Sequence, residues 1–127
     1  MSYQFLGSEN EGVEVENVRE KKQSIQRFDI WLVQLDPTQG SEIKKTRPCV
    51  VISTDELAAL KTAIIAPMTS KGFNFPTRIQ CTFQGKKGLI LLDQMRAVDK
   101  SRLTQKLCLI TKKTQIKTIH CLQELFA

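Results

Sequence analysis

Patterns that bind metals are nearly absent from this chain of 127 residues. It has one histidine, and no two of its four cysteines are spaced as C-x-x-C, which argues against a zinc site. We therefore expect no metal and no cofactor. The cysteines are Cys49, Cys81, Cys108 and Cys121. Most fall within apolar runs, where free cysteine behaves as a small buried hydrophobe, and this suits a reducing cytoplasm.

Long hydrophobic runs are also missing. The stretch 89–92 is typical of the longest and is far shorter than a membrane span. The first residues are polar and lack the apolar core of a signal peptide. We expect a soluble, cytoplasmic protein without a membrane partner. Its length suits a single domain.

Charge is plentiful but uneven. The net charge is +6, yet residues 1–26 hold three basic and five acidic side chains, which leaves +8 for the remainder. We divide the chain into a polar N-terminal extension, 1–26, and a basic domain, 27–127. A basic domain is typical of a protein with a polyanionic partner, although a basic surface also serves solubility. The extension's glutamates could lie against the basic domain and lower its activity, but a solvated tail explains the same residues more simply.

Alternating and β-branched runs predict a mainly β domain. The expected strands are 28–33, 48–52, 62–66, 77–83, 107–110, and one strand of 89–92 and 95–98 interrupted by Asp93-Gln94. We expect Pro67 to break or bulge the third strand and residues 85–88 to form a basic turn. Short helical segments are predicted near 55–60 and 99–103, and an amphipathic helix over 114–126. The fold class is a small closed or half-closed β-barrel with a C-terminal α-helix and short helical insertions.

Polar residues interrupt the strand-like runs at three places. The first is the connection 36–48, which holds a turn, a carboxylate, a basic cluster and Arg47 beside Pro48. The second is Thr69-Ser70, and the third is Asp93-Gln94. Strand pairing in a small barrel could bring all three together.

Cleavage of RNA without a metal needs the residue types found in these clusters. A base must take the proton of the ribose 2′-hydroxyl, a cation must bind the phosphate, and a hydroxyl must donate to it. Glu42, Arg47 and Thr69 supply these groups, and the planar fork of arginine matches two phosphate oxygens. DNA would not serve as substrate, because it lacks the 2′-hydroxyl.

Each of these residues also has a structural explanation. Arg47 could form a surface ion pair, and Thr69-Ser70 could be a helix cap or turn. A carboxylate at Asp93, within an apolar run, could be bonded to a neighbouring loop. The residue patterns alone therefore indicate a basic β domain able to handle phosphate, without naming a function.

Residues 28–125 resemble the MazF/PemK family of toxin ribonucleases. The segments that carry the resemblance occur in order: Asp29–Val33, Asp36–Glu42, Thr46–Pro48 leading into Val50–Ile52, Ala66–Ser70, Gly88 before Leu92–Arg96, and Asp99–Leu103. Their order and separations make the match specific.

The resemblance implies an SH3-like barrel, a homodimer and a metal-independent endoribonuclease of a type II toxin–antitoxin system. Such an enzyme cleaves single-stranded RNA to 2′,3′-cyclic phosphate and 5′-hydroxyl ends and is inhibited by a cognate antitoxin. Arg47 would be the acid or phosphate stabiliser, Thr69 the transition-state hydrogen bonder, and Glu42 a base or an orienter of Arg47. Possible supporting residues are Ser41, Ser70, Asp93 and Gln94. Expected RNA-binding residues are Lys44, Lys45, Lys71, Lys86, Lys87 and Arg96, with the loop 71–75 holding unstacked bases.

The chain departs from one branch of this family. That branch has histidine in place of Ser41 and arginine in place of Leu91, and it assigns the base to the aspartate that matches Asp93. The role of Asp93 here is therefore open. An alternative function is a non-enzymatic toxin of the same fold that binds a protein such as DNA gyrase. A terminal helix that ends in bulky exposed residues would favour this alternative.

Overall fold

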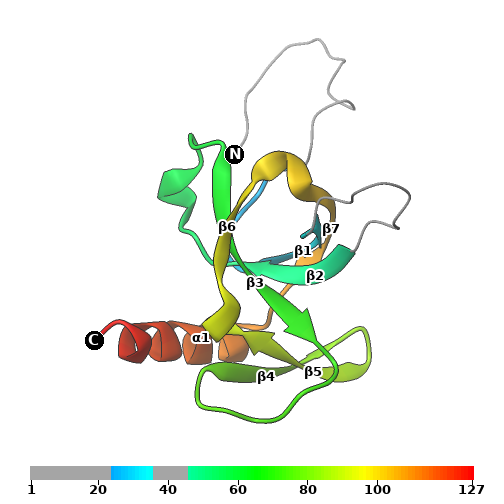
Figure 1. Cartoon of the computed structure of the whole chain (residues 1–127), viewed down its shortest axis with the longest axis vertical. Helices are drawn as coiled ribbons and strands as arrows, with labels where there is room; N and C mark the ends of the chain where they lie inside the picture. The colour runs from blue at the N-terminus through cyan, green and yellow to red at the C-terminus, as the bar shows by residue number, and fades with distance from the viewer. Residues whose placement is uncertain (1–23, 36–45) are drawn as a thin grey trace.

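The described strands of the protein form one curled antiparallel sheet, and an α-helix packs against one end of it (Figure 1). The structure, a computed structural model, describes residues 24–35 and 46–127. The strands are β1 (Asp29–Gln34), β2 (Thr46–Val51), β3 (Thr62–Thr69), β4 (Arg78–Phe83), β5 (Lys86–Leu91), β6 (Arg96–Asp99) and β7 (Leu103–Leu109). The helix α1 spans Lys112–Leu125, and short 3-10 turns cover Asp55–Leu57 (η3), Leu92–Gln94 (η4) and Lys100–Arg102 (η5).

The sheet curls into a half-barrel (Figure 1). It runs β4-β5-β3-β2-β1-β7, and β6 pairs with β3 away from this path. The predicted fold class is confirmed: a mainly β half-barrel with a C-terminal helix and short helical insertions. The helix of the described region is too short and too polar to cross a bilayer.

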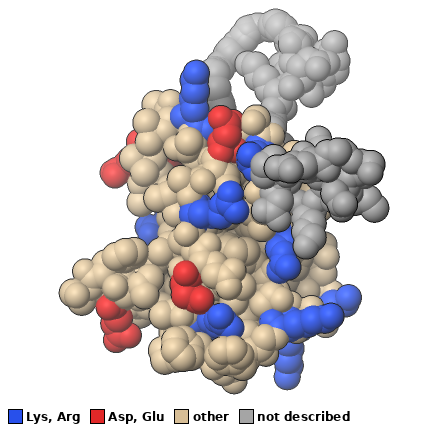
Figure 2. All heavy atoms as spheres, in the orientation of Figure 1, with Lys and Arg blue, Asp and Glu red and all other residues tan. Residues whose placement is uncertain are grey.

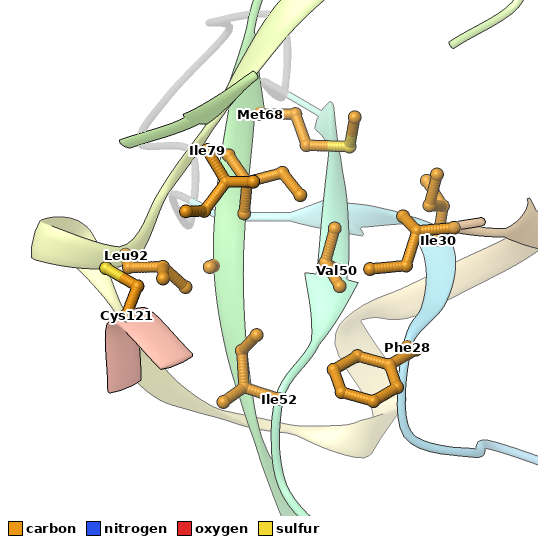
Figure 3. Packing of buried hydrophobic residues seen from close by; sticks show 11 residues of the cluster. Phe28, Ile30, Val50, Ile52, Met68, Ile79, Leu92 and Cys121 are labelled. Carbon is orange, nitrogen blue, oxygen red and sulfur yellow. The ribbon is translucent and has the colours of Figure 1, made fainter. Parts of the chain in front are cut away.

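Two apolar clusters lie on opposite faces of the central strands, because successive side chains of a strand point to opposite faces. On β2, Val50 belongs to one cluster and Val51 to the other. The first cluster, seen in Figure 3, joins the sheet to Cys121 of α1. The second contains Trp31 and draws on β1, β2, β3, β6 and the start of β7. Both clusters include residues of β2 and β3, so these two strands are packed on both faces.

The structure differs from the prediction in several details of the strands and turns, and the first concerns Pro67. Pro67 does not break the third strand, which continues to Thr69. β3 pairs with β6 up to Ile65 and with β5 from Met68 onward. Pro67 lies between these two sets of pairs, where no ladder hydrogen bond is required of its nitrogen on that side.

The predicted fifth strand is in fact two strands. η4 turns the chain at Leu92–Gln94, so that β5 and β6 pair with different parts of β3.

The tight turn before β5 is also shorter than expected. It is centred on Gln84 and Gly85, both at positive φ, whereas Lys86 already begins β5. The short helix expected over 55–60 is only η3, and β7 begins four residues before the predicted strand.

Candidate active site

Arg47 and Thr69, far apart in the sequence, border the same hollow. This hollow has a volume of about 340 Å³ and is lined by Leu35, Arg47, Pro67, Thr69, Lys71, Arg78, Leu91 and Gln94. β2 begins beside it and β3 ends beside it. β2 and β3 pair antiparallel, with Cys49 opposite Pro67. This pairing sets the start of β2 beside the end of β3, and these two strand ends carry two of the residues predicted to be catalytic.

Thr69 is the last residue of β3 and is half-buried. Its Oγ1 accepts a hydrogen bond of 3.1 Å from the backbone N–H of Lys71. The hydroxyl keeps its own proton, which it can donate to another oxygen. Pairing with Leu89 of β5 fixes the backbone here. The adjacent Gly88 allows that approach, because a Cβ at residue 88 would lie 2.8 Å from the carbonyl oxygen of Thr69.

Arg47 is exposed and lies opposite Val33 of β1. Among the residues that the structure describes, no carboxylate forms an ion pair with Arg47. Burial raises the pKa of the adjacent Cys49 thiol to about 12, and the positive charges of Arg47 and Arg96 partly oppose that rise. Both guanidinium groups thus contribute positive potential at this end of the half-barrel.

Asp93 is tied to a residue that the sequence did not single out. Arg78 Nε lies 3.2 Å from Asp93 Oδ1 and Arg78 Nη2 lies 3.3 Å from Oδ2. The hydroxyl of Thr77 also donates to Oδ1, at 3.2 Å. The hydrogen bond from Arg78 is the main reason that the pKa of Asp93 is below its ordinary value. Asp93 is therefore bonded to a neighbouring segment, one of the alternatives left open above.

No signal in the sequence identifies Arg78, which is one polar residue in an alternating strand. Only the register of the sheet, which sets Arg78 opposite Leu91, brings it to the hollow.

The other predicted residues divide between several places. Gln94 and Lys71 line the hollow, whereas Ser70 and Lys87 line a larger cavity of about 600 Å³ between the β4–β5 hairpin, the end of β7 and the start of α1. Lys86 and Arg96 begin β5 and β6 and line neither. Ser41, Glu42, Lys44 and Lys45 lie outside the described residues.

We place the candidate site in the smaller hollow, because the larger cavity contains neither Arg47 nor Thr69. Figure 2 shows several basic side chains at the right and lower right of the face drawn, with others spread over the rest of it. Within 24–35 and 46–127, no three His, Cys, Asp or Glu side chains group closely enough to hold a metal ion.

Comparison with known proteins gives consistent matches. Residues 26–126 match the family model described as PemK-like, MazF-like toxin of type II toxin-antitoxin system. The endoribonuclease MazF of Staphylococcus epidermidis is 32% identical over 105 residues, which cover 77% of this chain and 88% of that protein. The fold is similar to that of a MazE–MazF structure from Deinococcus radiodurans, with a TM-score of 0.71, 20% identity, and coverage of 83% of this chain and 97% of that one. It is also similar to an endoribonuclease in complex with its cognate antitoxin from a mycobacterial species, with a TM-score of 0.68, 16% identity, and coverage of 80% and 94%.

Proposed function

The chain belongs to the family of PemK-like, MazF-like toxins of type II toxin–antitoxin systems, and from this premise we propose that it is a metal-independent endoribonuclease that cleaves single-stranded RNA in the cytoplasm. The observation that supports the cleavage chemistry is the shared hollow, in which a guanidinium and a hydroxyl border one space. The relative from Staphylococcus epidermidis is itself an endoribonuclease.

The proposed reaction is transfer of the phosphodiester to the neighbouring 2′-oxygen. The 2′-hydroxyl gives its proton to a base and forms a bond to phosphorus, while the bond from phosphorus to the 5′-oxygen breaks and that oxygen gains a proton. Arg47 binds the phosphate oxygens or supplies the proton, and Thr69 donates a hydrogen bond to the crowded phosphate. Glu42 is the candidate base or the group that orients Arg47. The products carry a 2′,3′-cyclic phosphate and a 5′-hydroxyl.

The loop 71–75 is the proposed contact for unstacked bases. Phe73 and Phe75 are 65% and 54% exposed, and their rings meet edge to face with centroids 6.2 Å apart. Exposed aromatic faces bind bases by stacking, and nearby cations bind the backbone. Lys71 is one such cation within the hollow, and Lys44, Lys45, Lys86, Lys87 and Arg96 are further candidates.

We also propose two protein partners: a second copy of this chain and a cognate antitoxin. The mycobacterial protein of similar fold was solved in complex with its antitoxin. A basic domain of net charge +8 suits an acidic antitoxin segment. Light scattering of the purified chain would test the dimer, since a monomer at all concentrations contradicts it.

Removal of the Arg47 or Thr69 side chain tests the reaction. We expect the parent protein to cleave single-stranded RNA in EDTA and to leave cyclic-phosphate ends. Arg47→Ala and Thr69→Ala should each lower the rate by about 100-fold or more, because each loses a group aimed at developing charge. Arg27→Ala is the matched control, since its guanidinium bonds to the carbonyl of Ile52 and it does not line the hollow. Full activity in Arg47→Ala would refute the assignment.

One feature favours the alternative of a toxin that binds a protein. The chain ends in bulky exposed residues, with Leu125 37% and Phe126 74% exposed. Inhibition of gyrase supercoiling by the parent but not by Phe126→Ser, without RNA cleavage by either, would support that function instead.

A further inference from the structure

Arg78 is held in one orientation beside Arg47 and Thr69. Its side chain is only 16% exposed and lines the same hollow. Asp93 accepts hydrogen bonds from two of its nitrogens, and the guanidinium carbon lies 4.7 Å from the ring centroid of Phe73. A group fixed along one edge and against one face loses little further freedom when it binds a ligand.

The two hydrogen bonds to Asp93 involve only some of the N–H groups of Arg78. A guanidinium carries more N–H groups than one carboxylate accepts, and Nη1 makes neither of the two bonds to Asp93. Nη1 faces the backbone near Gly72, where an added Cβ would lie 3.7 Å from it. The pair with Asp93 therefore leaves the N–H groups of Nη1 available as donors.

The charges around the hollow favour an anion. Arg47, Lys71 and Arg78 come from three separate segments, and the lining, as far as the structure describes it, holds no carboxylate. We propose that Arg78 is a second guanidinium of this site and binds a phosphate of the RNA backbone, with Asp93 and Phe73 as its positioning residues. This inference rests on the proposed function, because it takes RNA as the ligand.

A purely structural role is the competing explanation. The pair of Arg78 and Asp93 joins the start of β4 to η4 and could serve only to fix that junction. A brace and a phosphate contact differ in one measurable respect. Loss of a brace lowers the unfolding temperature, whereas loss of a phosphate contact also reduces the salt dependence of RNA binding.

The test measures binding separately from cleavage. The probe is a mixed-sequence single-stranded RNA in which every 2′-hydroxyl is methylated, so that it cannot be cut. Its dissociation constant is measured over a range of salt concentrations for the parent, Arg78→Gln, Arg78→Lys and Asp93→Asn. The matched control is Arg27→Gln, because Arg27 also lies over a phenylalanine ring, at 4.8 Å from that of Phe28, but does not line the hollow.

For Arg78→Gln we expect about tenfold weaker binding and a slope of log affinity against log salt that is smaller by about 0.7, the value for one phosphate contact on a single strand. Arg27→Gln should keep the parental slope although it loses the same charge. Arg78→Lys should keep the charge but not the oriented guanidinium fork. Its affinity for the RNA should therefore lie between those of the parent and Arg78→Gln. Asp93→Asn should keep the slope and lower kcat/KM for cleavable RNA, because Arg78 remains charged but is no longer aligned.

Each other result has a definite meaning. Equal slopes for the parent and a folded Arg78→Gln would overturn the inference, even if Arg47→Ala abolishes cleavage and the proposed function stands. If Arg78→Gln does not fold, parental RNA affinity in Arg78→Lys together with parental kcat/KM in a folded Asp93→Asn would overturn the inference, because neither the guanidinium fork nor its alignment would then matter. Failure of the parent to bind or cleave RNA would overturn the inference and the proposed function together.

Discussion

At the scale of single residues, the pair of Asp93 and Arg78 links the candidate site to the stability of the fold. Hydrogen bonds from Arg78 hold the pKa of Asp93 below its ordinary value of 3.8. A carboxyl group whose pKa is lowered by folding stabilises the native state while it is ionised. That contribution is present above the ordinary pKa and is lost as the pH falls through the lower, folded value.

We therefore expect Asp93→Asn to lower the urea midpoint at neutral pH. The difference from the parent should shrink as the pH falls below about 3.8. Urea unfolding followed by circular dichroism over this range measures it. Glu56→Gln, which removes an exposed carboxylate of η3, is the control for net charge. A difference that stays constant from neutral to acid pH would contradict the ion-pair explanation.

Residue type made Arg47 and Thr69 candidates, because phosphate chemistry needs a cation and a donor, and the family resemblance supplied their expected roles. The structure brings these two to one hollow; their chemical roles remain predictions. Arg78 could not be selected in this way, because its position depends on a cross-strand neighbour, Leu91, and not on its neighbours in sequence. The predictions for Ser41, Glu42, Lys44 and Lys45 concern residues outside the described ranges.

At the scale of elements, the close approach of β5 to the end of β3 controls the position of Thr69. A Cβ at residue 88 would meet a backbone oxygen, which cannot move away as a flexible side chain could. We expect Gly88→Ala to cost about 1–3 kcal/mol in the free energy of unfolding, as overpacking commonly does. It should also slow cleavage, because the strands must separate at Thr69.

Gly85→Ala is the matched control for this substitution. Gly85 has φ +79, and an added Cβ there meets nothing within 4 Å. Gly85→Ala should lower the free energy of unfolding by about 1–2 kcal/mol through backbone strain, and it should retain cleavage. Chemical unfolding and an RNA cleavage assay on both variants make the comparison. An equal loss of cleavage in Gly88→Ala and Gly85→Ala would show that the contact between residue 88 and Thr69 does not control the cleavage rate.

The loop 71–75 offers a second prediction at this scale. Phe75→Leu keeps an apolar side chain but loses the aromatic face, so we expect KM for single-stranded RNA to rise about tenfold. Phe126→Leu, at an exposed phenylalanine of the C-terminus, should leave KM unchanged. An unchanged KM in Phe75→Leu would remove this residue from the base-binding surface.

The order and type of the elements were largely predictable, because alternation and helical spacing are local properties. The errors lie where tertiary structure decides the outcome. Pro67 stays within β3 because it falls between two pairing partners. Residues 92–94 form a turn because β5 and β6 reach different parts of β3, and neither fact is encoded in the local pattern.

At the scale of the whole molecule, the charge is divided between an acidic extension and a basic domain. If the extension lies against the basic domain, deletion of residues 2–23 should raise the rate of RNA cleavage at low salt. The gain should fade at high salt, because counterions screen the attraction. Residues 24–26 are retained, because Ile25 packs against the second cluster and the backbone N–H of Gln26 donates to Asp29. Equal rates before and after deletion would leave a solvated tail as the explanation.

The sequence by itself determined a basic, mainly β domain of this toxin family, because composition, alternation and ordered motifs are properties of the chain. It also made Glu42, Arg47 and Thr69 candidates for acting on a phosphodiester. Only the tertiary structure decided which of them meet. Antiparallel pairing sets the start of β2 beside the end of β3, and the register of β4 on β5 adds Arg78 to the same hollow. Such meetings depend on long-range strand pairing, which is fixed by the packing of the whole domain and not by any single segment.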